Sequence, residues 1–241
     1  MGFQIQMGFQ MGFYMYFLTT YSVCSVSCFL LEIIAPSMRV KEITRHEIVQ
    51  NYKIMTPTVV ANLALAYPYY SAIEKYLTFD NIIVLNCNDD FSDGYYDGYS
   101  DVYCCSLWYL YFFYYFFIWL LLTDVSFFAV HYMLHTPQMY WLHAKHHSFR
   151  YTHGIGAIYS SVFEFVVGNL GTATLPIYVF SIPQDYVKII IVLASFYTVV
   201  ISHSGFKCVN KTHLTHHLKY KVNYGLFLTD KIMGTSTVRY H

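Results

Sequence analysis

Charged side chains are scarce in this sequence. Its 241 residues include 14 lysines and arginines and 14 aspartates and glutamates, so charged residues make up 12% of the chain, against about 25% in a typical soluble domain. Apolar residues reach 56% and aromatic residues 20%. Because neither sign of charge is in excess, the composition offers no basic field for nucleic acid and no acidic solvating tail. The sequence therefore predicts a membrane protein.

The N-terminal segment has no charged residue before Glu32. A cleavable signal peptide needs a basic stretch ahead of its apolar core. We therefore interpret this segment as an uncleaved membrane span.

The six cysteines show neither the spacing of a zinc finger nor a dense disulfide framework. We interpret them as small apolar residues. A disulfide between Cys87 and Cys104 or Cys105 stays open as an alternative, if that part of the chain lies in an oxidising lumen.

Five stretches have the length and composition of a transmembrane helix, which needs about 20 mostly apolar residues. They are residues 11–35, 54–78, 106–130, 157–180 and 186–203. The sequence thus predicts an all-α integral membrane protein with four or five transmembrane helices. We divide it into an N-terminal region, residues 1–105, with transmembrane helices and an acidic loop, and a histidine-rich region, residues 106–241.

The connections between these stretches differ in charge. Residues 36–53, residues 131–156 and the tail after residue 203 contain lysine and arginine, whereas residues 79–105 contain six aspartates and neither basic residue. Basic loops stay in the cytoplasm, so we expect the first three on the cytoplasmic side and residues 79–105 in a lumen. The glycosylation sequon at Asn210 is then cytoplasmic and unmodified; its glycosylation in cells would contradict this orientation.

Eight of the twelve histidines fall into three boxes. On a helix, positions i, i+3 and i+4 share a face, so each box directs its imidazoles to one point. Two predicted spans and a turn lie between the second and third boxes, which returns the chain to the same membrane surface. The boxes are His131-x3-His135, His143-x2-His146-His147 and His213-x2-His216-His217.

Such a cluster indicates metal binding. Imidazole suits zinc, copper, iron and nickel, so the ligand type alone does not select the metal. A structural zinc site needs only four ligands and is normally rich in cysteine. Eight nitrogens imply two ions, and a pair of redox metals beside the bilayer suits oxygen activation against a lipid C–H bond.

Further motifs accompany the boxes: Asp124 lies seven residues before His131, and HSG, NYG and DKIMGT occupy residues 203–205, 223–225 and 230–235. In this order, over residues 120–236, the motifs resemble the fatty acid hydroxylase/sterol desaturase superfamily. The resemblance implies that residues 106–241 form the catalytic domain of a helical membrane enzyme. Its expected cofactor is a pair of iron ions, with zinc as a substitute in overexpressed material, and O2 is the expected co-substrate.

The resemblance also implies a reaction and a place in the cell. We expect hydroxylation or desaturation of a lipid taken from the bilayer: a sterol, a sterol precursor, or a fatty acyl or sphingolipid chain. The expected location is the endoplasmic reticulum membrane, with the active site facing the cytoplasm. The sequence lacks a haem-binding His-Pro-Gly-Gly signature, so we expect electrons from separate proteins such as cytochrome b5 and its reductase.

The ligand set implied by the resemblance adds one histidine, in the HSG motif, to the eight of the boxes. Asp124 and Glu164 match acidic positions of the family, and an acid in a span is costly to bury, so we expect each to orient a ligand histidine. For Glu164 the alternative is a side chain that reaches the membrane interface. The expected ligands are His131, His135, His143, His146, His147, His203, His213, His216 and His217.

The sequence departs from the family pattern in three places, one of which is a short stretch between HSG and the third box. The family commonly has His-Pro-x-Glu after the second box, where this chain has Ser161 and Val162 ahead of Glu164, so one ligand is missing. His153 either replaces that ligand or lies on the surface. The usual Trp before Asp230 is Thr229.

A different class of function also fits the boxes: a non-catalytic membrane protein that binds or transports metal. A transporter places ionisable groups along the bilayer midplane, whereas these boxes gather at one face. Metal analysis distinguishes the two hypotheses.

Overall fold

The computed structural model describes residues 12–79, 98–209 and 211–237. Apart from one isolated bridge between Arg39 and Phe206, every regular element in these ranges is a helix. The predicted all-α class is confirmed. The segment expected to form the acidic lumenal loop and the alternative disulfide lies largely outside the described residues.

Three helices in the described ranges are long and apolar enough to cross a membrane, consistent with an integral membrane protein. They coincide with the first, third and fifth predicted spans. They are α1 (Phe13–Ile34), the Ser106–Leu134 part of α3 (Gly98–Leu134), and Gln184–Ser202, which joins α6 (Gln184–Phe196) to the π-helix η5 (Tyr197–Ser202).

The other two predicted spans are helical but are not among these three. Residues 54–78 lie in α2 (Arg45–Phe79), which contains Pro57, Pro68 and the buried Asn62. The 157–180 stretch begins with the end of a 3-10 turn, η3 (Gly154–Ile158), and becomes the π-helix η4 (Glu164–Gly171) and α5 (Thr172–Phe180). Polar residues and turns therefore make both stretches less suited to lipid than we expected.

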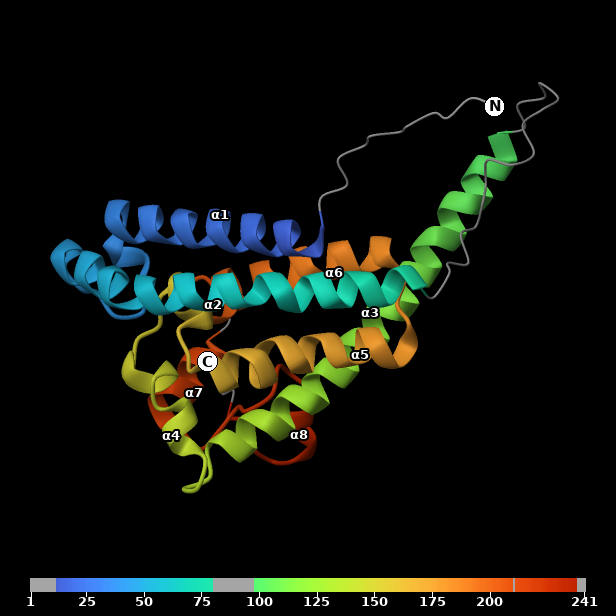
Figure 1. Ribbon diagram of the computed structural model, residues 1–241. Coiled ribbons are helices and arrows are strands. Elements are labelled where there is room, and N and C mark those ends of the chain that lie inside the picture. The colour runs from blue at the N-terminus through green and yellow to red at the C-terminus, as the bar shows by residue number, and fades with distance from the viewer. Residues whose placement is uncertain (1–11, 80–97, 210, 238–241) are drawn as a thin grey trace.

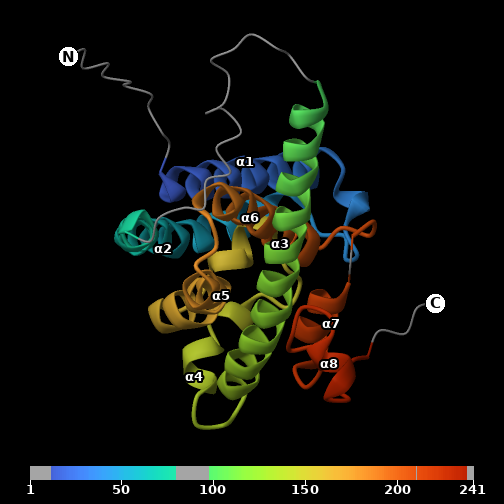
Figure 2. The ribbon, with the colours of Figure 1, turned by 90° about the vertical axis from the view of Figure 1, so that its right-hand side faces the viewer.

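The helices form two sets (Figure 1). α1 packs against α2 and α6, while α3 crosses the molecule obliquely and packs along α5. Turning the molecule shows α4 (Tyr140–His143), α7 (Thr212–Lys219) and α8 (Thr229–Ile232) gathered at the C-terminal end of α3 (Figure 2). This end carries the histidine boxes. α3 begins at Gly98, so residues 98–105 are helical and do not belong to the predicted loop.

The three basic connections meet in space. Val40 N donates to Gly205 O over 2.9 Å, and Arg39 Nη2 donates to Thr152 O over 2.8 Å. Gly205 has φ +70°, and a Cβ there would lie 2.8 Å from Thr152 O, so only glycine fits. The contact of all three segments agrees with their placement on one side of the membrane.

Candidate metal centre

The nine histidines expected to bind metal come together in two groups. In each group the nearest ring nitrogens all lie within 4.8 Å of one another. Five histidines form the first group and four form the second. The five-histidine group is His131, His135, His143, His147 and His216; the four-histidine group is His146, His203, His213 and His217.

In the five-histidine group, the Nε2 atoms approach closely. His216 Nε2 lies 3.0 Å from His135 Nε2 and 3.2 Å from His147 Nε2. His131 Nε2 and His143 Nε2 are 3.1 Å apart. Two nitrogens that bind one ion at about 2.1 Å are about 3.0–3.4 Å apart at common coordination angles. The donor set therefore fits a metal ion.

The four-histidine group has the same spacing. His217 Nε2 lies 3.1 Å from His146 Nε2 and 3.2 Å from His213 Nε2, and His203 Nε2 lies 3.4 Å from His146 Nε2. His203 follows η5 directly, so the HSG motif supplies a nitrogen to this group. The structure thus places two clusters of imidazole nitrogens side by side, enough for two ions.

Backbone carbonyls fix three of the rings. A carbonyl only accepts, so each of these Nδ1 atoms carries the hydrogen and donates it, which leaves the Nε2 lone pair directed at the cluster. The pairs are His131 Nδ1 with Tyr224 O (2.7 Å), His203 Nδ1 with Thr198 O (2.8 Å) and His216 Nδ1 with Val222 O (2.7 Å).

Burial keeps these imidazoles neutral. Desolvation, with the neighbouring imidazoles adding to it, lowers the pKa of His143 to about 2 and that of His135 to about 3. Desolvation also lowers the pKa of His216 to about 4. At neutral pH the rings are therefore in the form that binds a metal.

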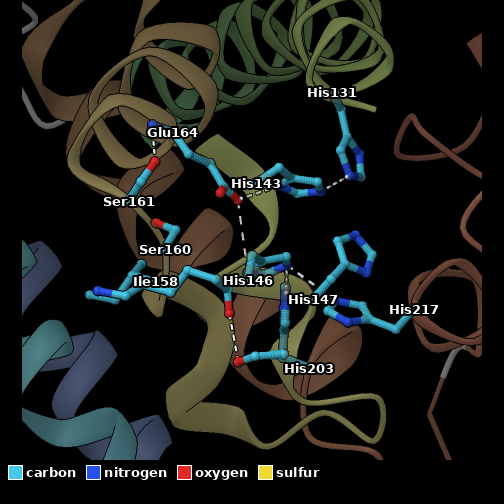
Figure 3. Close-up of polar contacts among 12 residues, drawn as sticks. His131, His143, His146, His147, Ile158, Ser160, Ser161, Glu164, His203 and His217 are labelled. Atoms are coloured by element: carbon cyan, nitrogen blue, oxygen red, sulfur yellow. Dashed lines mark hydrogen bonds and ion pairs between the residues drawn. The ribbon is translucent and has the colours of Figure 1, made fainter. Parts of the chain in front are cut away.

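Glu164 lies beside two of the histidines (Figure 3). Its Oε1 is 2.9 Å from His143 Nδ1 and 3.9 Å from His146 Nδ1. The residue is 4% exposed, so the alternative in which it reaches the membrane interface is wrong. Ser161 Oγ accepts from Glu164 N over 3.2 Å, so the serine that replaces the family's histidine helps to start this helix.

Among the described residues, Asp124 contacts no histidine directly. Its carboxylate accepts four backbone N–H groups, of Leu226 and Phe227 at Oδ1 and of Leu228 and Thr229 at Oδ2. The Thr229 hydroxyl also donates to it, over 2.8 Å. No histidine is among these partners, because seven residues along α3 separate Asp124 from the first box by roughly 10 Å. Asp124 anchors the loop over residues 226–229.

This loop leads to a residue that the sequence reasoning did not assign. Asp230 accepts the backbone N–H groups of Tyr224 and Gly225, each over 2.7 Å. The Tyr224 carbonyl then accepts from His131 Nδ1. Asp124 and Asp230 therefore act on His131 through the NYG segment. The DKIMGT motif, which begins with Asp230, was the feature of the sequence that could have indicated this role.

His153 belongs to neither group. It is 1% exposed, its Nδ1 lies 2.6 Å from Glu32 Oε2, and its Nε2 lies 3.0 Å from Asn51 Nδ2. Both expectations for it, a replacement ligand and a surface residue, are wrong. The reason is a buried acid on α1 that no motif indicated.

A cavity of about 630 Å³ reaches the histidines. Five of the nine histidines line it: His131, His143, His146, His203 and His213. Apolar residues of α1, α3, α5 and α6, with Tyr70 of α2, form much of the rest. The centre is therefore accessible to an elongated apolar ligand.

We predict that Asp124→Asn destabilises the fold and weakens metal binding. Hydrogen bonds to a charged acceptor contribute about 1.5–3 kcal/mol each, and the amide would direct an N–H₂ group at backbone donors. The free energy of unfolding should fall by roughly 3 kcal/mol, measured by chemical denaturation in detergent. Asp185→Asn, at a side chain 75% exposed, is the control. Unchanged stability and metal content in Asp124→Asn would contradict the anchoring role.

A family model and a curated protein that match this chain both carry the description fatty acid hydroxylase. The family model described as "Fatty acid hydroxylase" matches residues 116–235. The protein named "Fatty acid hydroxylase domain-containing protein 2" from Macaca fascicularis is 31% identical over 127 residues, which are 50% of this chain and 38% of that protein. The chain thus matches well under half the length of this relative. No solved structure matches the chain.

Proposed function

Because residues 116–235 belong to the fatty acid hydroxylase family, we propose that the chain is an O2-dependent di-iron oxidoreductase that hydroxylates or desaturates a membrane lipid. The observation that carries the proposal is the division of nine histidines into two buried groups. A single structural ion would not need nine imidazoles. The cavity beside both groups supports a lipid substrate.

The protein contributes orientation, exclusion of water and a path for the lipid. Bound iron would supply the redox chemistry by which O2 attacks an unactivated C–H bond. The carbonyls of Tyr224, Thr198 and Val222 hold ligand rings, and Glu164 holds His143. The apolar walls hold the lipid chain, and its exact position relative to the histidines decides between alcohol and alkene.

The remaining parts of the proposal concern the surroundings of the enzyme. We place it in the endoplasmic reticulum membrane with the histidine groups towards the cytoplasm. Electrons come from separate proteins such as cytochrome b5 and its reductase. The basic connections that meet around Arg39 support this orientation.

Elemental analysis with an activity assay tests the function. The purified full chain, reconstituted with iron, should contain about two ions and consume O2 in step with lipid oxidation when reductant and a reductase system are supplied. An active preparation with one ion or fewer would contradict the di-iron assignment. Readily lost zinc without any turnover would instead support the non-catalytic metal-binding protein.

A further inference from the structure

The cavity, which five of the nine histidines line, has few charged residues in its wall. Among the described residues that line it there is no lysine or arginine, and the carboxylate that lines it near the histidines is Glu164. Away from the metal ions that the histidines would hold, an anionic group drawn into this space would be desolvated without a cationic side chain to pair with. The end of the ligand that lies away from the histidines is therefore uncharged.

Apart from the histidines and Glu164, two of the described polar side chains that line the cavity have an atom without a hydrogen-bond partner. Among the described residues, Thr123 Oγ1 and Asn169 Nδ2 are buried without a hydrogen bond. Thr123 is 5% exposed. Neighbouring hydroxyls are already paired, since Thr172 Oγ1 donates to Gly168 O over 2.5 Å and Thr174 Oγ1 donates to Leu170 O over 2.8 Å.

Thr123 and Asn169 belong to the same wall. Trp119, Thr123 and Ser126 share one face of α3 by helical spacing. Trp119 Nε1 and Ser126 Oγ each donate to a backbone carbonyl in the first turn of α5, over 2.7 and 3.3 Å. Asn169 lies in the turn immediately before α5. The two unpartnered groups therefore face the cavity where α3 meets η4 and α5.

We propose that Thr123 and Asn169 form a polar anchor that binds the oxygen atom of an uncharged lipid, either a hydroxyl or an amide or ester carbonyl. The Asn169 amide donates to this oxygen, and the Thr123 hydroxyl donates to it or accepts from it. A buried donor without a partner is costly in free energy. A lipid oxygen that accepts this hydrogen bond therefore gains binding free energy that an alkane cannot gain. The proposal rests on the proposed function for the oxidation of the bound lipid. The anchor itself is a binding site, and binding can be measured without oxidation.

The anchor also restricts where a lipid is oxidised. Thr123 precedes His131 by eight residues on α3, which correspond to roughly 12 Å along the helix axis. The carbon that bears the anchored oxygen cannot reach the histidines at that separation. Oxidation takes place on carbons remote from the polar end.

Equilibrium binding to the metal-loaded full chain in phosphatidylcholine nanodiscs tests the anchor. The probes are radiolabelled hexadecanol, hexadecane and palmitate, and the variant is Thr123→Val/Asn169→Leu. The wild type should bind hexadecanol about tenfold more tightly than the variant does, while hexadecane binds both alike. Palmitate should bind both more weakly than hexadecanol binds the wild type.

Thr172→Val is the matched control, because Thr172 lines the same cavity but its hydroxyl already donates to Gly168 O in the preceding turn. It should keep the wild-type affinity for hexadecanol. Equal hexadecanol affinity in the wild type and the double variant would overturn the anchor even if the enzyme oxidises lipids. Selective binding of hexadecanol by a wild type that consumes no O2 would support the anchor and remove the proposed activity.

Discussion

Replacing His146 with alanine is expected to abolish lipid oxidation and to lower the metal content from two ions to one. His146 Nε2 lies 3.1 Å from His217 Nε2 and 3.4 Å from His203 Nε2, within the four-histidine group. Loss of a residue that only supports a ligand costs about 10–100-fold in affinity or activity, so loss of a ligand should exceed 100-fold. Elemental analysis and product formation measure the two effects.

The five-histidine group should respond in the same way. His216 lies between His135 and His147, with Nε2 separations of 3.0 and 3.2 Å, so His216→Ala and His135→Ala should also abolish turnover while the chain still inserts and folds. His46→Ala is the control, because His46 is exposed in the first turn of α2. If His146→Ala keeps both ions and wild-type product formation, the catalytic interpretation of the boxes is wrong.

Arg39→Met is expected to destabilise the whole chain, by about 3–5 kcal/mol. Arg39 Nη1 lies 2.8 Å from Glu32 Oε2, and the two residues are 1% and 0% exposed. Removing the cation leaves a buried carboxylate with His153 and the Tyr52 hydroxyl as its remaining partners. The substitution also removes the bonds to Ser204 O and Thr152 O. Chemical denaturation in detergent measures the loss.

The double variant Glu32→Leu/Arg39→Met separates the effect of the unpaired buried charge from the effect of the lost backbone hydrogen bonds. Without either charge no ion is buried unpaired, so the double variant should be clearly more stable than Arg39→Met alone. Equal stability of the two would show that the backbone bonds of Arg39, and not its pairing with Glu32, dominate. Arg39 joins Glu32 of α1 to the carbonyl of Ser204, the residue directly after His203. Arg39→Met should therefore also weaken metal retention in the four-histidine group.

The sequence by itself identified the nine histidines that the structure brings together. The spacing of each box places its imidazoles on one face over one or two helical turns, a local property that needs no tertiary structure. The apolar stretches likewise determined the helical class, and the basic connections indicated that the boxes meet at one surface. Glu164, the acid beside the histidines, could also be predicted, because its position matches that of an acid in a known family motif.

Only the tertiary structure decided how the ligands divide and what holds them. The adjacent His146 and His147 belong to different groups, because neighbours on the 3-10 turn η2 (His146–Ser148) point about 120° apart. The anchoring of residues 226–229 by Asp124 and the pairing of Glu32 with His153 join residues more than 100 positions apart. Such contacts depend on how whole helices pack, and the periodicity of a sequence carries no information about partners at that distance.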